Sequence, residues 1–259
     1  FYLSCGSCSE CLAGREQRCT VLKGWVGVHC DGGYAPLCAL PARNVIPVSS
    51  DLDPVTATVI PDAVATPVHV AARAGIEASD LVVVIGAGGG VGSHMIQVAR
   101  LHGAEVVGLD VGEQKLQSVA DLGARPLSSA SFSELSGRIG GRAPTLVIDL
   151  VGSAESIEWG RAALEPGGRQ VLLTTYRGQS FPLSPRQMVS SELTVLGSRY
   201  ATRAEVATAA RLVESGNVSP VIGRVVSPEE APQVHIQLRR GALLGRGAID
   251  WRSARDRAQ

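Results

Sequence analysis

The sequence predicts an α/β fold in which helices cover a doubly wound parallel sheet. Residues 81–86 (LVVVIG) form a short apolar run rich in β-branched residues, which is typical of a strand buried on both faces. A glycine-rich turn follows this run, and apolar residues then recur at helical spacing from Val91 to Ala99. Strand-like and helix-like segments keep alternating beyond it, and this alternation indicates right-handed βαβ units.

The remaining elements follow in chain order and define the expected domains. Residues 1–50 are irregular, and only Val45, Ile46 and Val48 look strand-like there. Beyond residue 86 we expect helices at 113–122, 154–164 and 203–214, and strands at 104–110, 125–127, 145–151, 168–175 and 193–199. Past Gly216 we expect a strand, a helix and a strand at 220–226, 228–240 and 245–250. We predict a nucleotide-binding domain over 50–215, with 1–49 and 216–259 as two pieces of a second domain.

Composition limits the partners of the chain. Its 259 residues carry 24 Lys plus Arg and 24 Asp plus Glu, so nothing suggests a nucleic-acid or membrane-surface binder. The uncharged run 81–99 is interrupted by glycines and polar residues, so a strand, turn and helix explain it better than a membrane span. The chain starts at Phe1 and shows no signal peptide, so we expect a cytoplasmic protein that is truncated at its N-terminus.

The glycine-rich turn is a candidate cofactor site. Glycine permits positive φ and close approach of a pyrophosphate, and the following helix offers free N–H groups. Asp110 ends the second strand, where it is either a solvated strand end or an acceptor for a ribose diol that would repel a 2′-phosphate. The pattern favours NAD over NADP, and Lys115 either reaches the same ribose or is an exposed helix lysine. The turn residues expected at the cofactor are Gly86, Gly88, Gly89, Gly90, Val91 and Gly92.

Four of the six cysteines lie close together near the N-terminus, in the spacing C-x2-C-x2-C-x7-C. Disulfides are one interpretation, although cysteines two residues apart pair only with strain and nothing indicates secretion. An iron–sulfur cluster is another, but its fourth cysteine usually comes earlier and precedes proline. Four thiolates on a tetrahedral zinc fit best and leave no open position, which favours a structural site. Its ligands would be Cys5, Cys8, Cys11 and Cys19.

In the order of its motifs the sequence resembles the medium-chain, zinc-dependent alcohol dehydrogenase family. The similar segments are the four-cysteine lobe, DGGYA (31–35), DAVATPVH (62–69), GAGGGVG (86–92) and LLGRGAI (243–249). The resemblance implies a Rossmann NAD-binding domain joined to part of a GroES-like, β-rich catalytic domain. Cys30 and Cys38 are expected to fill small apolar positions around DGGYA.

The resemblance also implies a catalytic zinc that polarises the alcohol oxygen while hydride passes to NAD. The family's third zinc ligand falls on Asp62, which otherwise would only cap a helix or turn after Pro61. The first two ligands, a Cys and a His, have no counterpart in this chain. We therefore expect the chain alone to bind NAD and the structural zinc but to be inactive or nearly so.

Further cofactor contacts follow from the same resemblance. Thr66 matches a residue near the nicotinamide, and it could also be an N-cap before Pro67. Arg246 would contact the pyrophosphate or remain solvated. The carboxyl ends of strands, where ligands bind in such sheets, contribute Val151, Gly152, Thr174, Thr175 and Ser198.

The expected substrate is a small alcohol or the matching carbonyl compound, handled by a homodimer or homotetramer. One alternative is a zinc-free quinone or enoyl reductase that uses NADPH, against which the cysteine lobe, Asp62 and Asp110 argue. Another is a non-catalytic nucleotide-binding module whose cysteines act as a redox switch.

Overall fold

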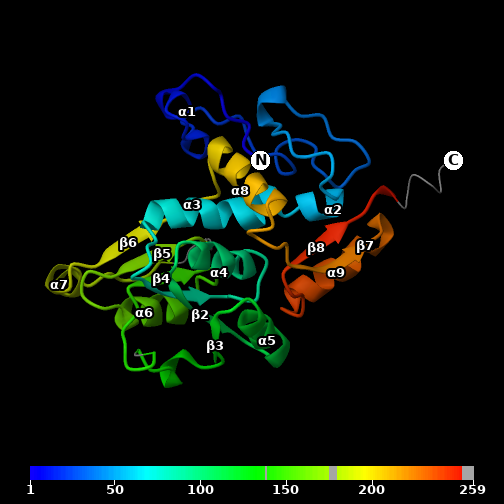
Figure 1. Ribbon diagram of the computed structural model, residues 1–259. Helices are drawn as coiled ribbons and strands as arrows, with labels where there is room; N and C mark the ends of the chain where they lie inside the picture. The colour runs from blue at the N-terminus through cyan, green and yellow to red at the C-terminus, as the bar shows by residue number, and fades with distance from the viewer. Residues whose placement is uncertain (138, 175–179, 253–259) are drawn as a thin grey trace. The chain divides into compact units, whose positions relative to one another are not determined.

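The computed structural model describes residues 1–137, 139–174 and 180–252 (Figure 1). The chain divides into two compact units. Unit 1 contains Phe1–His69 and the chain from Tyr200 onward, and unit 2 contains Val70–Arg199. The predicted limits of the nucleotide-binding domain, 50 and 215, lie outside unit 2 on both sides. Residues 50–69 and 200–215 group with unit 1, where helix α8 (Arg203–Glu214) packs on the helical turn η3 (Ile60–Val64).

Unit 2 is built on a six-stranded parallel sheet in the order β3-β2-β1-β4-β5-β6. The strands run outward from β1 to β3 on one side and from β4 to β6 on the other, so the direction of winding reverses at β1. Helices from the two halves therefore cover opposite faces of the sheet. The predicted doubly wound fold is confirmed. The strands are β1 (Leu81–Ile85), β2 (Glu105–Asp110), β3 (Arg125–Ser128), β4 (Leu146–Asp149), β5 (Arg169–Leu172) and β6 (Thr194–Gly197). The helices are α4 (Gly92–Leu101), α5 (Glu113–Asp121), η4 (Phe132–Glu134), α6 (Ala154–Ala163) and α7 (Pro185–Ser190).

The core of unit 2 explains the apolar run that predicted the sheet. All five residues of β1 are fully buried, because β1 lies between β2 and β4 and is covered on both faces. Alternate residues share a face, and Leu81, Val83 and Ile85 pack with neighbours on β2 and β4 beneath Trp159 of α6. Fully burying side chains of this kind stabilises a fold by about 1.5 to 3 kcal/mol each.

A buried ion pair ties the amino ends of three strands together. Asp80, which precedes β1, is 3% exposed, and its two carboxylate oxygens lie 2.6 and 2.7 Å from Nη2 of Arg169 at the start of β5. The hydroxyl of Thr145, just before β4, donates to the same carboxylate at 2.6 Å. The backbone N–H of Glu77 donates to it at 3.0 Å. This network fixes the register of β1, β4 and β5 at the end of the sheet opposite the glycine turn.

Replacing Asp80 by alanine is expected to destabilise the protein by about 3 kcal/mol, because it leaves the half-buried Arg169 guanidinium without its counter-ion. Urea unfolding measures the change as a shift in midpoint. Glu105→Ala is the matched control, since Glu105 forms an exposed pair with Arg142, and such pairs contribute less than about 1 kcal/mol. Equal effects of the two substitutions would contradict the structural role given to Asp80.

Unit 1 contains short helices and one small sheet in the described residues. Strands β7 (Ile222–Val226) and β8 (Arg246–Ile249) pair in parallel, and α9 (Ala231–Arg239) connects them after the turn η5 (Pro228–Glu230). No strand forms at Val45–Val48, where Pro47 lacks an N–H and both valines are exposed, so that prediction was wrong. The other elements are α1 (Ser9–Leu12), η1 (Glu16–Arg18), η2 (Ala42–Asn44) and α2 (Pro54–Ala57).

A helical stretch that begins well before the helix start considered at Pro67 runs from α2 through η3 into α3 (Ala65–Ala74). It begins at Asp53, whose carboxylate accepts the N–H of Thr56 at 3.0 Å, with Pro54 as the first helical residue. Thr66 therefore lies inside the helix and is not an N-cap. The stretch Pro54–Ala74 is long and apolar enough to span a membrane by composition, but half of it is buried, as in a core helix.

Candidate functional site

The glycine turn between β1 and α4 is tightly closed. Gly86 has φ of +82°, and its N–H donates to the carbonyl of Leu109 at 2.8 Å, so the turn is fastened to β2. A Cβ on Gly92 would lie 2.1 Å from the carbonyl oxygen of Gly86. Only glycine therefore fits at the first residue of α4. The turn brings the backbone N–H groups at the start of α4 to the carboxyl edge of the sheet, which is an anion-binding geometry.

Asp110 is locked beside this turn. It is 6% exposed, its Oδ2 accepts the N–H of Gly88 at 2.7 Å, and its Oδ1 accepts the N–H of Val111 at 2.8 Å. Lys115 of α5 places Nζ 3.5 Å from Oδ1, with its side chain 17% exposed. Asp110 is thus no solvated strand end, and Lys115 is no ordinary exposed lysine. A Cβ on Gly88 would lie 2.7 Å from Cβ of Lys115, so this glycine also keeps the turn close to α5.

The other predicted turn residues complete the loop. The N–H of Gly89 donates to the Gly86 carbonyl at 3.2 Å, and the carbonyl of Val91 accepts the N–H of Met95 in α4 at 2.8 Å. The carbonyl of Gly90 lies 2.7 Å from Nδ1 of His94, which is completely buried. His94 thus engages the backbone carbonyl of Gly90, and the backbone N–H groups of the loop are left for an anion.

The ends of β4, β5 and β6 lie along the same edge of the sheet. Asp149 ends β4, and its Oδ1 accepts the N–H groups of Val151 and Gly152 at 2.8 Å each, which fixes the predicted adenosine-side loop. Thr174 donates its hydroxyl to the carbonyl of Leu150 at 2.8 Å, and Ser198 donates its N–H to β5. Within the described residues, the buried hydroxyl of Ser198 has no hydrogen-bond partner. Thr175 lies outside the described residues.

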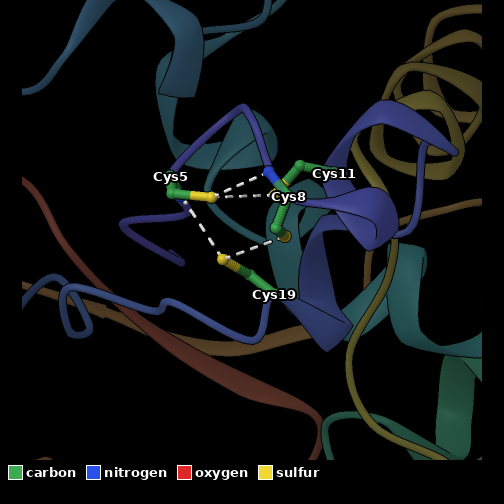
Figure 2. A group of neighbouring side chains, drawn as sticks. All are labelled: Cys5, Cys8, Cys11 and Cys19. Carbon is green, nitrogen blue, oxygen red and sulfur yellow. Dashed lines mark hydrogen bonds between the residues drawn. The ribbon is translucent and has the colours of Figure 1, made fainter.

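The four predicted zinc ligands converge on one point (Figure 2). All four sulfur atoms lie within 4.8 Å of one another, and the Cys5–Cys11 and Cys8–Cys19 pairs are 3.9 Å apart. Sulfurs bound to a tetrahedral zinc at about 2.3 Å would be about 3.8 Å apart, so the donor set fits zinc. The cysteines are free thiols, so the disulfide interpretation is wrong for this structure.

Backbone N–H groups prepare these thiols for a metal. Hydrogen bonds from the backbone of Cys11 and Thr20 lower the pKa of Cys8 to about 5. Those from Ser7 and Cys8 lower the pKa of Cys5 to about 7. Burial raises the pKa of Cys11 to about 12. Cys8 is therefore a thiolate at neutral pH and Cys5 is partly ionised, and a bound cation would complete the ionisation of the cluster.

Asp62 forms an ion pair and a hydrogen bond within unit 1. Its Oδ2 is paired with the guanidinium of Arg246, and its Oδ1 accepts the hydroxyl of Thr66 at 3.1 Å. Across the described ranges, the four-cysteine cluster is the one place where three or more Cys, His, Asp or Glu ligand atoms converge. Asp62 and Arg246, which were predicted to bind the catalytic zinc and the pyrophosphate, therefore pair with each other in this structure.

Comparisons with known proteins agree with this geometry. A family model described as zinc-binding dehydrogenase matches residues 90–215. An NAD-dependent alcohol dehydrogenase of Sulfolobus acidocaldarius is 30% identical over 246 residues, which cover 94% of this chain and 71% of the relative. The chain belongs to the zinc-dependent alcohol dehydrogenase family. The resemblance seen in the sequence is thereby confirmed.

Two further relatives show which activities occur among the proteins similar to this chain. The structure of a cobalt- and zinc-bound alcohol dehydrogenase from Pyrobaculum aerophilum matches with a TM-score of 0.85 and 29% identity, over 95% of this chain and 72% of that one. An acryloyl-coenzyme A reductase of Sulfurisphaera tokodaii is 30% identical over 230 residues, 88% of this chain and 68% of the relative. The relatives are oxidoreductases, and they include both dehydrogenases and reductases.

Sequence reasoning missed two polar groups of the chain. Asp149 was counted only as part of a strand, although an acidic residue at a strand end just before Gly152 is a signal for a fixed loop. Glu205 caps α8 with Thr202 and also accepts from Nδ1 of His69 at 2.9 Å. Burial alone would raise the pKa of Glu205, but its hydrogen bonds to His69 and Thr202 outweigh burial and lower it. This pair joins α3 to α8 across 136 residues, and no local pattern indicates it.

Proposed function

We propose that the protein is an NAD-dependent oxidoreductase that transfers a hydride between NAD and a small alcohol or carbonyl compound. The observation that carries this proposal is the Asp110 carboxylate, which is buried and held against Gly88 at the glycine turn. A fixed carboxylate there accepts hydrogen bonds from the two ribose hydroxyls of NAD and repels the 2′-phosphate of NADP. When bound, NAD supplies the hydride chemistry through its nicotinamide ring.

The residues of unit 2 bind and orient this cofactor. The N–H groups of the glycine turn face the pyrophosphate, with the N-terminal end of α4 adding a favourable dipole. Lys115 lies beside Asp110 and would donate to the same ribose. We assign the loop of Val151 and Gly152 to the adenosine, and Thr174 and Ser198 to the nicotinamide side. In unit 1, the cofactor contacts of Thr66 and Arg246 stay predictions.

The structure supports the structural zinc site at the four cysteines more strongly than the catalytic zinc site predicted at Asp62. We assign a structural zinc to Cys5, Cys8, Cys11 and Cys19, whose thiolates would hold it in a closed tetrahedron. The role of Asp62 as a catalytic zinc ligand stays a prediction, because the carboxylate pairs with Arg246. Hydride transfer is therefore proposed without a step at Asp62.

That ion pair also favours a second candidate function. A reductase that passes hydride from NADH or NADPH to an activated carbon–carbon double bond needs no catalytic metal ligand at Asp62. Acryloyl-coenzyme A reductases are among the relatives of the chain. Side-by-side assays with short alcohols and with acryloyl-coenzyme A separate the two candidates. Turnover of the thioester alone would favour the reductase.

A cofactor titration tests the main proposal. NADH is expected to bind at least about 10-fold more tightly than NADPH, and Asp110→Ala should weaken NADH binding by about 10- to 100-fold, as charged hydrogen bonds are lost. Nicotinamide fluorescence measures both affinities. Asp121→Ala is the control, because Asp121 ends α5 and its carboxylate accepts a hydrogen bond only from the side chain of Gln117 among the described residues. Tighter binding of NADPH by the wild-type protein would overturn the choice of NAD.

The remaining assignments belong to the whole protein. This chain spans about seven-tenths of the relatives it matches, so substrate and assembly are proposals. A homodimer or homotetramer and a cytoplasmic location stay predictions, as does the low activity expected of the chain alone.

A further inference from the structure

Two cysteines lie outside the zinc cluster, and the structure places both at the surface. Cys30 and Cys38 are exposed free thiols. The expectation that they fill small apolar positions was wrong, because the loop that carries them buries neither side chain. No function considered above uses these thiols.

The two thiols face the same backbone oxygen. Sγ of Cys30 lies 3.6 Å from the carbonyl oxygen of Asp31, and Sγ of Cys38 lies 3.9 Å from that same oxygen. The sulfurs therefore cannot be further apart than these two distances together. Cys30 is anchored, because its carbonyl accepts the N–H of Gly27 at 3.1 Å. Residues 31–40 form no helix or strand, and Cys38 lies in this irregular segment.

We propose that Cys30 and Cys38 form a reversible redox pair that closes to a disulfide by exchange with a low-molecular-weight disulfide such as oxidised glutathione. The thiolate of one cysteine attacks the small disulfide, forming a mixed disulfide and releasing one thiol. The second cysteine then attacks the protein sulfur of that mixed disulfide and releases the other thiol. Two protein thiols are oxidised, one small disulfide is reduced to two thiols, and the protein protons pass to the leaving thiolates.

The loop between the cysteines suits this closure. A disulfide requires Cα atoms about 4.4 to 6.8 Å apart, and a segment containing Gly32 and Gly33 can adjust to that spacing. The loop is short, so bringing its ends together costs little chain entropy. Exposure lets the small disulfide reach either sulfur. The zinc-cluster thiols differ, since they are half-buried and would be held by the metal.

Closure would also act on a contact outside the loop. Tyr34 lies between the two cysteines, and its hydroxyl is 3.0 Å from Nε2 of His235 on α9. Drawing Cys30 and Cys38 together changes the backbone around Tyr34. The redox state of the pair is therefore coupled to the hydrogen bond between Tyr34 and His235.

Peptide mass spectrometry of the zinc-loaded protein, equilibrated in glutathione buffers of rising oxidised fraction and then alkylated, tests the proposal. We expect a single cross-link between Cys30 and Cys38 with loss of two hydrogens, full reversal by dithiothreitol and no loss of zinc. In Cys38→Ser, Cys30 should stop at the mixed disulfide with glutathione, and Cys30→Ser should leave Cys38 in the same state. Both substitutions are at exposed positions, and circular dichroism verifies the fold.

Two results would overturn the proposal. One is stable glutathione adducts on both cysteines of the wild-type protein without a cross-link at any buffer ratio. The other is a cross-link from Cys30 or Cys38 to a zinc-cluster cysteine with release of the metal. These outcomes are independent of cofactor binding, so they leave the proposed hydride transfer untouched.

Discussion

Cys8→Ser is expected to abolish stoichiometric zinc binding and to lower the thermal stability of unit 1 sharply. Cys8 contributes one of four converging sulfurs, and hydrogen bonds from the backbone of Cys11 and Thr20 lower its pKa to about 5, which makes it the readiest thiolate. A hydroxyl cannot replace a thiolate on zinc, and a structural zinc contributes directly to folding free energy. Metal analysis should give about one zinc per chain for the wild type and less than about a tenth for the variant.

The zinc affinity should also fall with decreasing pH. The cysteines bind as thiolates, so protons compete with the metal. Affinity is expected to fall with pH throughout the range below about 12, because zinc must displace the Cys11 proton, and to fall more steeply below pH 7, where Cys5 protonates, and below pH 5, where Cys8 follows. Competition with a chromophoric chelator measures both steps. Cys38→Ser should retain zinc. Retention of zinc by Cys8→Ser, or an affinity independent of pH, would contradict the four-thiolate site.

Gly92→Ala is expected to disrupt unit 2 and remove cofactor binding together. The added Cβ would meet the Gly86 carbonyl oxygen at 2.1 Å and Cα of Ala87 at 2.7 Å. Both are backbone atoms, so no change of rotamer relieves the clash and the turn must open. Overpacked interiors lose about 1 to 3 kcal/mol, and a clash with fixed backbone should exceed that range. Urea unfolding and NADH titration report the two losses.

Gly197→Ala provides the matched control for this change. Gly197 ends β6, nothing lies within 4 Å of a Cβ built there, and its φ is not positive. Its replacement should shift stability by less than about 0.5 kcal/mol and leave NADH binding unchanged. If Gly92→Ala unfolds at the same urea concentration as Gly197→Ala, the turn is looser than the structure shows.

Local patterns were enough to predict the sheet of unit 2 and the residues at its carboxyl edge. The β1 run is apolar because both its faces are covered, so its continuous run of β-branched residues identified it. The short spacing of the four cysteines likewise predicted their convergence. Such features depend on residues that are near each other in the chain, and the sequence displays them directly.

Features that depend on distant residues were beyond this reasoning. Asp62 and Arg246 are 184 residues apart, and nothing near either one predicts their ion pair. The sequence offered Pro67 as the first residue of a helix capped by Thr66, whereas the helical stretch begins at Pro54 and η3 accommodates Pro61 within it. Exposure of Cys30 and Cys38 also depends on how an irregular loop lies, which no hydrophobic period encodes.

The double attachment of Asp110 limits how cofactor preference can be redesigned. A switch towards NADP conventionally removes the acidic residue at the end of the second strand. Here the same carboxylate also holds the N–H of Gly88, so its removal loosens the loop that must bind the pyrophosphate of either cofactor. A useful specificity variant of this protein must therefore supply a new acceptor for Gly88 along with a cation for the 2′-phosphate.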